Sequence, residues 1–200
     1  MSDVQSVRKP SLGFSPAQDD PVSGILTFII ADLIVFAFLF VGFMVERHHQ
    51  LELFNDASAA LSVDFGIINT LILVSSGVLV VYAVEAARQG NAESFRQWVA
   101  VAVVVGAGFG VSKVIEWGDK FSHGINLLTN DFYMFYFALT GAHFLHFLGG
   151  MAALVYVWTL SFTKPVNGQA YTKIEAVALY WHMVDLLWLL IFPLLYLLDV

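Results

Sequence analysis

The sequence contains no cysteine, few charged residues and no cluster of lysine or arginine. Without cysteine the chain cannot form disulfides, thiolate zinc sites, iron–sulfur clusters or a covalently attached c-type haem, so any metal would need histidine and carboxylate ligands. The 9 basic and 16 acidic residues give a formal net charge of −7. Because no basic stripe is available to neutralise phosphates, we expect no nucleic-acid partner.

Long apolar stretches dominate the chain. Of its 200 residues 58% are hydrophobic and 12% are charged, and the mean hydropathy is +0.76, which is typical of an integral membrane protein. A membrane-spanning helix needs about 20 predominantly apolar residues, and a lipid-exposed backbone must satisfy its own hydrogen bonds. The sequence therefore predicts an all-α, polytopic membrane bundle of five transmembrane helices, which cover about residues 24–45, 65–84, 98–115, 132–162 and 176–198.

The chain divides into two parts. Residues 1–23 are rich in proline, serine and aspartate and contain no apolar run, which predicts a flexible cytoplasmic tail rather than a signal peptide. Residues 24–200 form the five-helix domain, whose connections are too short for a second folded domain. Lys113 lies near the end of the third stretch, from where a lysine side chain can snorkel toward the headgroups.

The distribution of basic residues predicts the orientation of the chain. With five crossings, the amino terminus shares one side with the second and fourth connections. That side carries most of the lysines and arginines, namely Arg8, Lys9, Arg88, Arg96, Lys164 and Lys173. The opposite side holds Arg47 and Lys120, with Lys113 at its edge. The positive-inside rule therefore places the amino terminus in the cytoplasm and the carboxyl terminus outside.

Asp32 lies well inside the first stretch, which contains no basic residue. Placing a charged group at the bilayer centre costs roughly 2.5–3.5 kcal/mol of insertion free energy even on the scale that gives the lowest values. A charged residue at this position therefore indicates a structural or functional role. Asp32 is therefore either protonated or paired with another helix. Its candidate roles are proton handling, ligand binding, helix packing and contact with a lipid headgroup.

Pairs of polar residues also occur at helical spacing in the later stretches. His143 and His146 lie on one face of the fourth stretch, and His182 and Asp185 lie on one face of the fifth. Trp181 precedes His182. At the outer end of the third stretch, Glu116 follows Lys113 by three residues.

These imidazoles and carboxylates have two interpretations. Gathered in one bundle, they resemble the ligand set of a carboxylate-bridged metal site, although the Glu-x-x-His pairs of di-iron bundles are missing from the predicted spans. In the favoured interpretation they form a buried network in which histidine and carboxylate satisfy one another and fix the helix register, because unpaired polar groups are costly in hydrocarbon. The residues that can complete such a network are Tyr136, Tyr180, Asn69 and Ser75.

Four blocks of the sequence resemble, in the same order, those of the cytochrome c oxidase subunit III family. Residues 69–77 match its N-T-x-x-L-x-x-S-G element, and Glu116-Trp117 match its E-Y/E-W element. Residues 139–146 read L-T-G-A-H-F-L-H and are followed by Gly149-Gly150, as in its T-G-x-H-x-x-H-x-x-x-G block. Residues 180–188 read Y-W-H-M-V-D-L-L-W and are similar to its Y-W-H-F-V-D-x-x-W block.

The resemblance implies a non-catalytic subunit, without a cofactor of its own, in a multi-pass five-helix form of the bacterial inner membrane with a periplasmic carboxyl terminus. Its partner would be the catalytic subunit of a haem-copper oxidase superfamily complex, which would hold haem with copper or non-haem iron. Phospholipid bound in a cleft is also implied. The family usually has glutamate at the position of Asp32.

Within the family, residues 116–133 are most similar to the branch associated with bacterial nitric oxide reductases. The role expected there is accessory, in assembly, lipid binding and stability of the catalytic subunit during denitrification. The alternative is subunit III of an aerobic cytochrome c oxidase, supporting proton uptake by its neighbour. Remote alternatives are a free-standing intramembrane metal enzyme and a proton channel. The candidate residues of the polar network or lipid contact are Asp32, Glu116, His143, His146, Trp181, His182 and Asp185.

Overall fold

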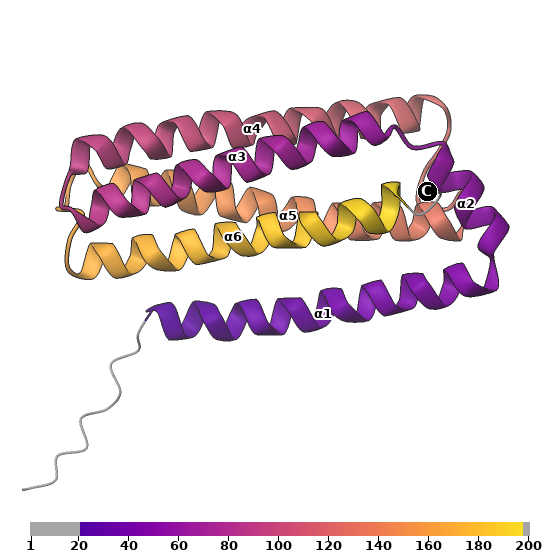
Figure 1. The fold of residues 1–200 in the computed structure, drawn as a ribbon, viewed down its shortest axis with the longest axis horizontal. Helices are drawn as coiled ribbons and strands as arrows, with labels where there is room; N and C mark the ends of the chain where they lie inside the picture. Colours follow the sequence, from indigo (N-terminus) through magenta and orange to yellow (C-terminus); the bar gives the residue numbers. More distant parts are fainter. Residues whose placement is uncertain (1–20, 198–200) are drawn as a thin grey trace, which may run out of the picture.

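The computed structural model describes residues 21–197, and this range folds into helices joined by short loops (Figure 1). The helices in chain order are α1 (Pro21–His49), α2 (Leu51–Ala59), α3 (Val63–Arg88), α4 (Ala92–Ser122), α5 (Asp131–Leu160) and α6 (Gln169–Tyr196). All except α2 are long and apolar enough to cross a membrane. For residues 21–197, the prediction of an all-α bundle with five helices able to span a membrane is therefore confirmed.

The long helices extend beyond the predicted spans at most of their ends. They contain 26 to 31 residues, so they are about 39 to 46 Å long and reach past the hydrocarbon core into the headgroup layers. Polar caps allow this extension. The side chain of Asn91 accepts a hydrogen bond from the Ser94 amide at the start of α4, and Asn130 does the same for Tyr133 in α5. Of the predicted tail, residues 21–23 begin α1, and residues 1–20 lie outside the described residues.

The short helix α2 is missing from the prediction because its nine residues are too few to register as a span. Its apolar side points inward, where Phe54 is fully buried and meets the rings of Phe43 and Phe132 edge-on at centroid distances of 5.2 and 5.6 Å. The hydroxyl of Ser58 donates to the carbonyl oxygen of Leu195 at 2.8 Å. Helix α2 thereby ties the end of α1 to the end of α6.

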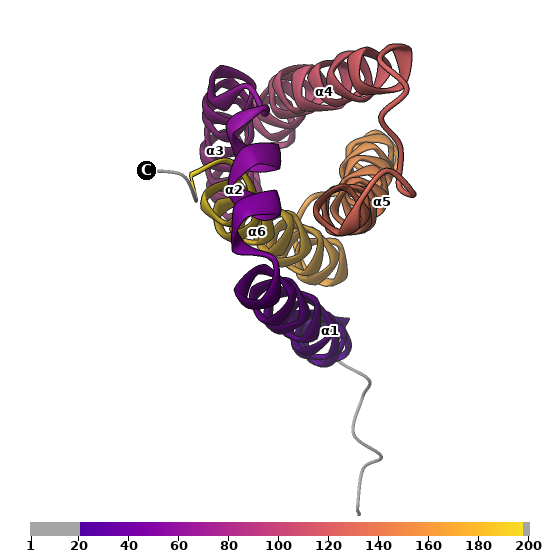
Figure 2. The same cartoon turned by 90° about the vertical axis from the view of Figure 1, so that its right-hand side faces the viewer.

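The long helices surround an aromatic core. Helix α3 packs most extensively on α4, and α6 packs on both α3 and α5, so that these four helices form the main bundle. Helix α1 lies outside it, against α6 and α5 (Figure 2). In the centre, the Phe109 ring lies 5.0 Å from both the Phe147 and the Trp188 rings. Helix α1 consequently keeps most of its apolar surface exposed to the surroundings.

Glycine allows α5 to approach Trp181 of α6 closely. A Cβ atom at Gly150 would lie 2.8 Å from a carbon of the Trp181 ring, which is too short for a real contact. Trp181 is fully buried, so it has no free space into which to move. In the same helix, a Cβ atom at Gly141 would meet nothing within 4 Å.

We expect Gly150→Ala to lower the free energy of unfolding by about 1 to 3 kcal/mol, because the added methyl group overpacks the α5–α6 contact. The matched control Gly141→Ala should be neutral or stabilising, since alanine is the better helix former. Unfolding of the detergent-solubilised protein measures both variants. Equal stability of the two variants would contradict the close packing described here.

Candidate functional site

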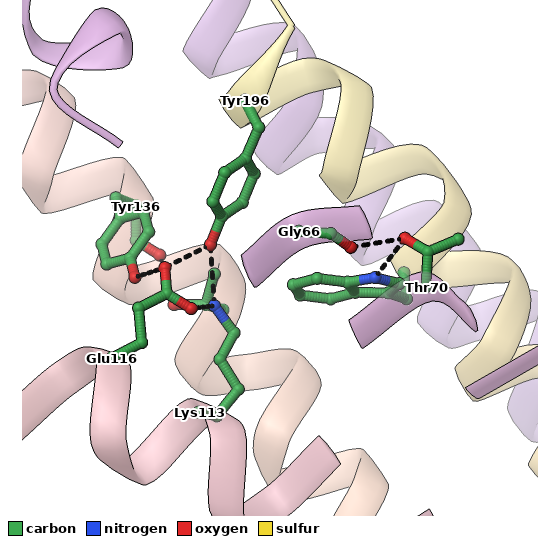
Figure 3. Close-up of polar contacts among 8 residues, drawn as sticks. Gly66, Thr70, Lys113, Glu116, Tyr136 and Tyr196 are labelled. Atoms are coloured by element: carbon green, nitrogen blue, oxygen red, sulfur yellow. Dashed lines mark hydrogen bonds and ion pairs between the residues drawn. The ribbon is translucent and has the colours of Figure 1, made fainter. Parts of the chain in front are cut away.

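The most deeply buried charges lie between α4, α5 and α6. Lys113 is 0% exposed, and its Nζ donates to Oε2 of Glu116 and to the hydroxyl of Tyr196, both at 2.9 Å. The second carboxylate oxygen, Oε1 of Glu116, accepts hydrogen bonds from Tyr136 at 2.7 Å and from Tyr196 at 2.5 Å (Figure 3). We call Lys113, Glu116, Tyr136 and Tyr196 the Lys113 cluster.

Aromatic rings surround the ammonium group of Lys113. Its Nζ lies 4.9 Å from the ring centroid of Trp188 and 5.3 Å from that of Tyr136, distances at which the ring faces attract a cation. Trp188 is held in turn, because its indole N–H donates to the hydroxyl of Thr70 at 3.0 Å. The cluster and Trp188 therefore connect all four helices of the main bundle.

The prediction that Lys113 snorkels to the headgroups is wrong. Helix α4 continues for more than two turns beyond Lys113, to Ser122, so this lysine does not lie near a helix end. Its spacing of three residues from Glu116 places both on one face of α4, and that face turns inward. The spacing was visible in the sequence, whereas the contribution of Tyr196 was not, because it follows Lys113 by 83 residues.

Asp32 and His146 form a second polar pair, between α1 and α5. Nε2 of His146 lies 3.0 Å from Oδ2 of Asp32, and Nδ1 lies 2.7 Å from the carbonyl oxygen of Ala142. The side chains are 18% and 22% exposed for Asp32 and His146 respectively. Tyr180 donates to the backbone carbonyl of His146 at 3.2 Å. The expectation that Asp32 pairs with another helix agrees with this geometry.

The geometry of this pair requires one shared proton. A carbonyl oxygen accepts only, so Nδ1 of His146 must carry a hydrogen to bond to Ala142. The short contact between Nε2 and Asp32 then also needs one hydrogen, which sits either on the imidazole or on the carboxyl. In both forms the pair as a whole is neutral, which is the form that hydrocarbon favours.

His182 and Asp185 form a third, looser pair on α6. Nδ1 of His182 lies 3.6 Å from Oδ2 of Asp185, which exceeds hydrogen-bond length. Both side chains lie against Gly77 of α3, where a Cβ atom would collide with Oδ2 of Asp185. Glycine in the middle of α3 therefore makes room for the carboxylate.

The remaining predicted residues are packed separately. His143 is fully buried and donates through Nε2 to the carbonyl oxygen of Val184 at 3.0 Å. Within residues 21–197, the indole N–H of Trp181 and the side-chain amide of Asn69 are buried without a hydrogen-bond partner. Ser75 is exposed, and it is the neighbouring Ser76 that turns inward and donates to the Ala102 carbonyl at 2.9 Å.

The predicted single network is thus divided into separate clusters: one joins α4, α5 and α6, one joins α1 and α5, and one lies on α6 against α3. The first two satisfy their members by side-chain contacts or backbone carbonyls, whereas Oδ1 of Asp185 in the third has no partner among the described residues. In the described part of the chain, no three His, Cys, Asp or Glu side chains come together as metal ligands do. What this arrangement does chemically is hold helices in register.

Comparison with known proteins relates these features to one family. The model of the family described as "Cytochrome c oxidase subunit III" matches residues 17–200, which include all five long helices. The chain belongs to this family.

Relatives named cytochrome c oxidase subunit 3 include proteins from Thermostichus vulcanus and Corynebacterium diphtheriae, each 31% identical. The first alignment covers 90% of this chain and 89% of the relative, and the second covers 86% and 85%. The cytochrome bo(3) ubiquinol oxidase subunit 3 of Pseudomonas putida is 26% identical over 90% of this chain and 86% of its own length.

Membership of the subunit III family establishes a multi-pass membrane protein and implies a catalytic oxidase subunit as its partner. The names of the two 31% identical relatives fit the alternative interpretation, an aerobic cytochrome c oxidase, better than an association with nitric oxide reductase. The sequence blocks that suggested the family also carry the structural clusters. Asp185 comes from the Y-W-H block, His146 from the T-G-x-H block and Glu116 from the E-W element.

We expect Lys113→Met to lower the free energy of unfolding by about 3 to 5 kcal/mol, because it leaves Glu116 buried without its cation. The double variant Lys113→Met with Glu116→Gln should recover most of that loss, since it removes both charges. Unfolding in detergent measures both variants. A double variant as unstable as the single one would show that the loss does not come from the unpaired charge of Glu116.

We expect Asp32→Asn to change the free energy of unfolding by less than about 1 kcal/mol, because the amide can donate to Nε2 of neutral His146 as a protonated carboxyl does. Asp32→Leu should lose about 1 to 3 kcal/mol, since it leaves Nε2 without a partner. The two variants are compared in the same unfolding assay. An equally large loss in both would contradict the shared proton.

Proposed function

We propose that the chain is a non-catalytic, redox-centre-free subunit III of a bacterial respiratory haem-copper oxidase complex that reduces oxygen. In this role it binds the catalytic subunit, supports its assembly and stability, and holds lipid beside it. The observation that carries the proposal is the family match over residues 17–200, supported by relatives named as subunits of cytochrome c and ubiquinol oxidases. The haem and copper belong to the catalytic partner.

The separate polar clusters support a structural role for the intramembrane charges. Glu116 uses both carboxylate oxygens within the Lys113 cluster, and His146 uses both ring nitrogens. Groups bound in this way position helices and resist exchange with solvent. The Asp32–His146 pair also keeps a proton within the membrane, which suits a neighbour that takes up protons.

The orientation that we propose has the amino terminus in the cytoplasm and the carboxyl terminus in the periplasm. Lys113 is buried and paired with Glu116, so it no longer counts among the loop charges. Arg47 and Lys120 then remain on the periplasmic side, and the other basic residues lie on the cytoplasmic side. The positive-inside bias is thus stronger than the sequence alone suggested.

Lipid has a matching surface between α4 and α5. A groove of about 460 Å³ there is lined by apolar side chains, among them Val111, Phe144, Leu148 and Met151. Such a groove suits the acyl chain of a phospholipid. We therefore propose that this side of the bundle faces lipid in the assembled complex.

A second candidate function is that of an accessory subunit of nitric oxide reductase. It is favoured by residues 116–133, which resemble the branch of the family associated with that enzyme. In that case the partner would contain haem and non-haem iron instead of copper. The fold and the polar clusters suit both partners equally.

Purification in mild detergent through a tag on the amino terminus tests the proposal. We expect a haem-containing catalytic subunit to co-purify, and metal analysis with an optical spectrum to find copper together with oxygen-reducing activity. Co-purified b-type haem with a c-type cytochrome and no copper would instead support the nitric oxide reductase candidate. A haem-free polypeptide from membranes that contain both enzymes would overturn both.

A further inference from the structure

A polar pair lies at mid-membrane on the outside of the bundle. His182 is the fourteenth of the 28 residues of α6, and Gly77, beside it, lies in the middle of α3. The His182 side chain is 41% exposed. At this depth an imidazole facing hydrocarbon is unfavourable, and intramembrane polar residues normally face protein or a polar cavity.

The pair also has unmet hydrogen-bonding capacity. Oδ1 of Asp185 is buried, and no hydrogen-bond partner for it exists among residues 21–197. Its other oxygen has only the 3.6 Å contact with His182. The Asp32–His146 pair is different, because its contact is 3.0 Å and both ring nitrogens are used. Because Oδ1 is enclosed by the bundle, what a partner can reach is the exposed ring of His182, whereas Asp32 and His146 complete each other.

The surroundings of His182 form a cleft along α6. The cleft has a volume of about 440 Å³, and α1 and α3 form its walls through Val22 and Val81. Figure 2 shows α6 between these two helices. The cleft runs from His182 to Glu85 and Arg88 at the end of α3. We call this side of the bundle the α6 face.

The α6 face suits protein better than lipid. An acyl chain in the cleft would end against His182, and it would leave the imidazole without a hydrogen-bond partner. The groove between α4 and α5 offers an acyl chain an apolar lining without this conflict. A transmembrane helix, by contrast, can lie along α6 with apolar side chains in the cleft and one polar side chain at the level of His182.

We propose that the α6 face is the surface on which the catalytic subunit docks, through a transmembrane helix that presents a hydrogen-bonding side chain to His182 at mid-membrane. This inference rests on the proposed function, because it assigns a place to the partner that the function requires. It also divides the bundle surface, with the protein partner on α6 and lipid on the α4–α5 groove.

Photo-crosslinking in native membranes tests the docking surface. The photoreactive amino acid benzoylphenylalanine is introduced at Val81 or Leu186 on the α6 face, which are 52% and 47% exposed. The matched controls are Val111 and Leu148 in the α4–α5 groove, which are 61% and 47% exposed. We expect both α6-face positions to crosslink to the haem-bearing subunit and both control positions to give none.

Crosslinks at the control positions without any at Val81 or Leu186 would overturn the proposed face. The same holds if no position crosslinks in a complex that still co-purifies with haem, because the face would then be out of reach of the partner. If no haem protein co-purifies, the proposed function itself fails. The two failures are thus distinguished by the pull-down alone.

A variant tests the polar pair itself. We expect His182→Leu to reduce the catalytic subunit retained after a detergent wash by about threefold, the change that one interhelical hydrogen bond typically brings. Unfolding of the isolated chain should stay unchanged, because the side chain is half exposed. Tyr156→Leu, on α5 and 50% exposed, is the control and should retain its partner. Unchanged retention in His182→Leu would remove His182 from the interface.

Discussion

The buried ion pair between Lys113 and Glu116 is the interaction on which the rest of the structure depends. A lysine inside a membrane bundle is tolerated only when its charge is surrounded, and here Tyr136 of α5 and Tyr196 of α6 complete the surroundings. The charges of α4 can therefore be buried only when α5 and the last turn of α6 are in place. Such a pair contributes specificity of helix register more than net stability.

The sequence predicted the number of membrane helices because long apolar runs have a single stable solution in lipid. It drew most spans shorter than the helices, since hydropathy falls at the headgroups while N-terminal caps such as Asn91 and Asn130 let a helix begin earlier. The carboxyl ends of α5 and α6 are exceptions, because these helices end at Leu160 and Tyr196, before the predicted limits of 162 and 198. Helix α2 was missed because the burial of Phe54 depends on contacts with other helices. Phe54 packs on Phe43 of α1 and on Phe132 of α5, and Phe132 is distant from it in the sequence.

The sequence named most polar residues of the spans as candidates, but it left Lys113 and Tyr196 out of the candidate site and left the pairing open. The spacing of three residues along one helix predicted that His182 and Asp185 lie together. Lys113 and Glu116 have the same spacing, but their ion pair was not predicted. Contacts between helices, such as that of Asp32 with His146, depend on how each helix is rotated about its axis. The sequence does not determine this rotation when a helix is apolar on all its faces. The position of Lys113 was misjudged because the predicted span ended at residue 115. Helix α4 continues to Ser122, so Lys113 lies deeper in the bundle than the sequence indicated.

The exposed His182 on the α6 face and the apolar groove between α4 and α5 give the molecule two different sides. A cryo-electron microscopy structure of the complex in lipid nanodiscs would test this account most directly. It predicts a helix of the catalytic subunit within hydrogen-bond distance of His182, and acyl-chain density over Val111 and Leu148. A partner helix over Val111 and Leu148, with lipid against His182, would contradict it.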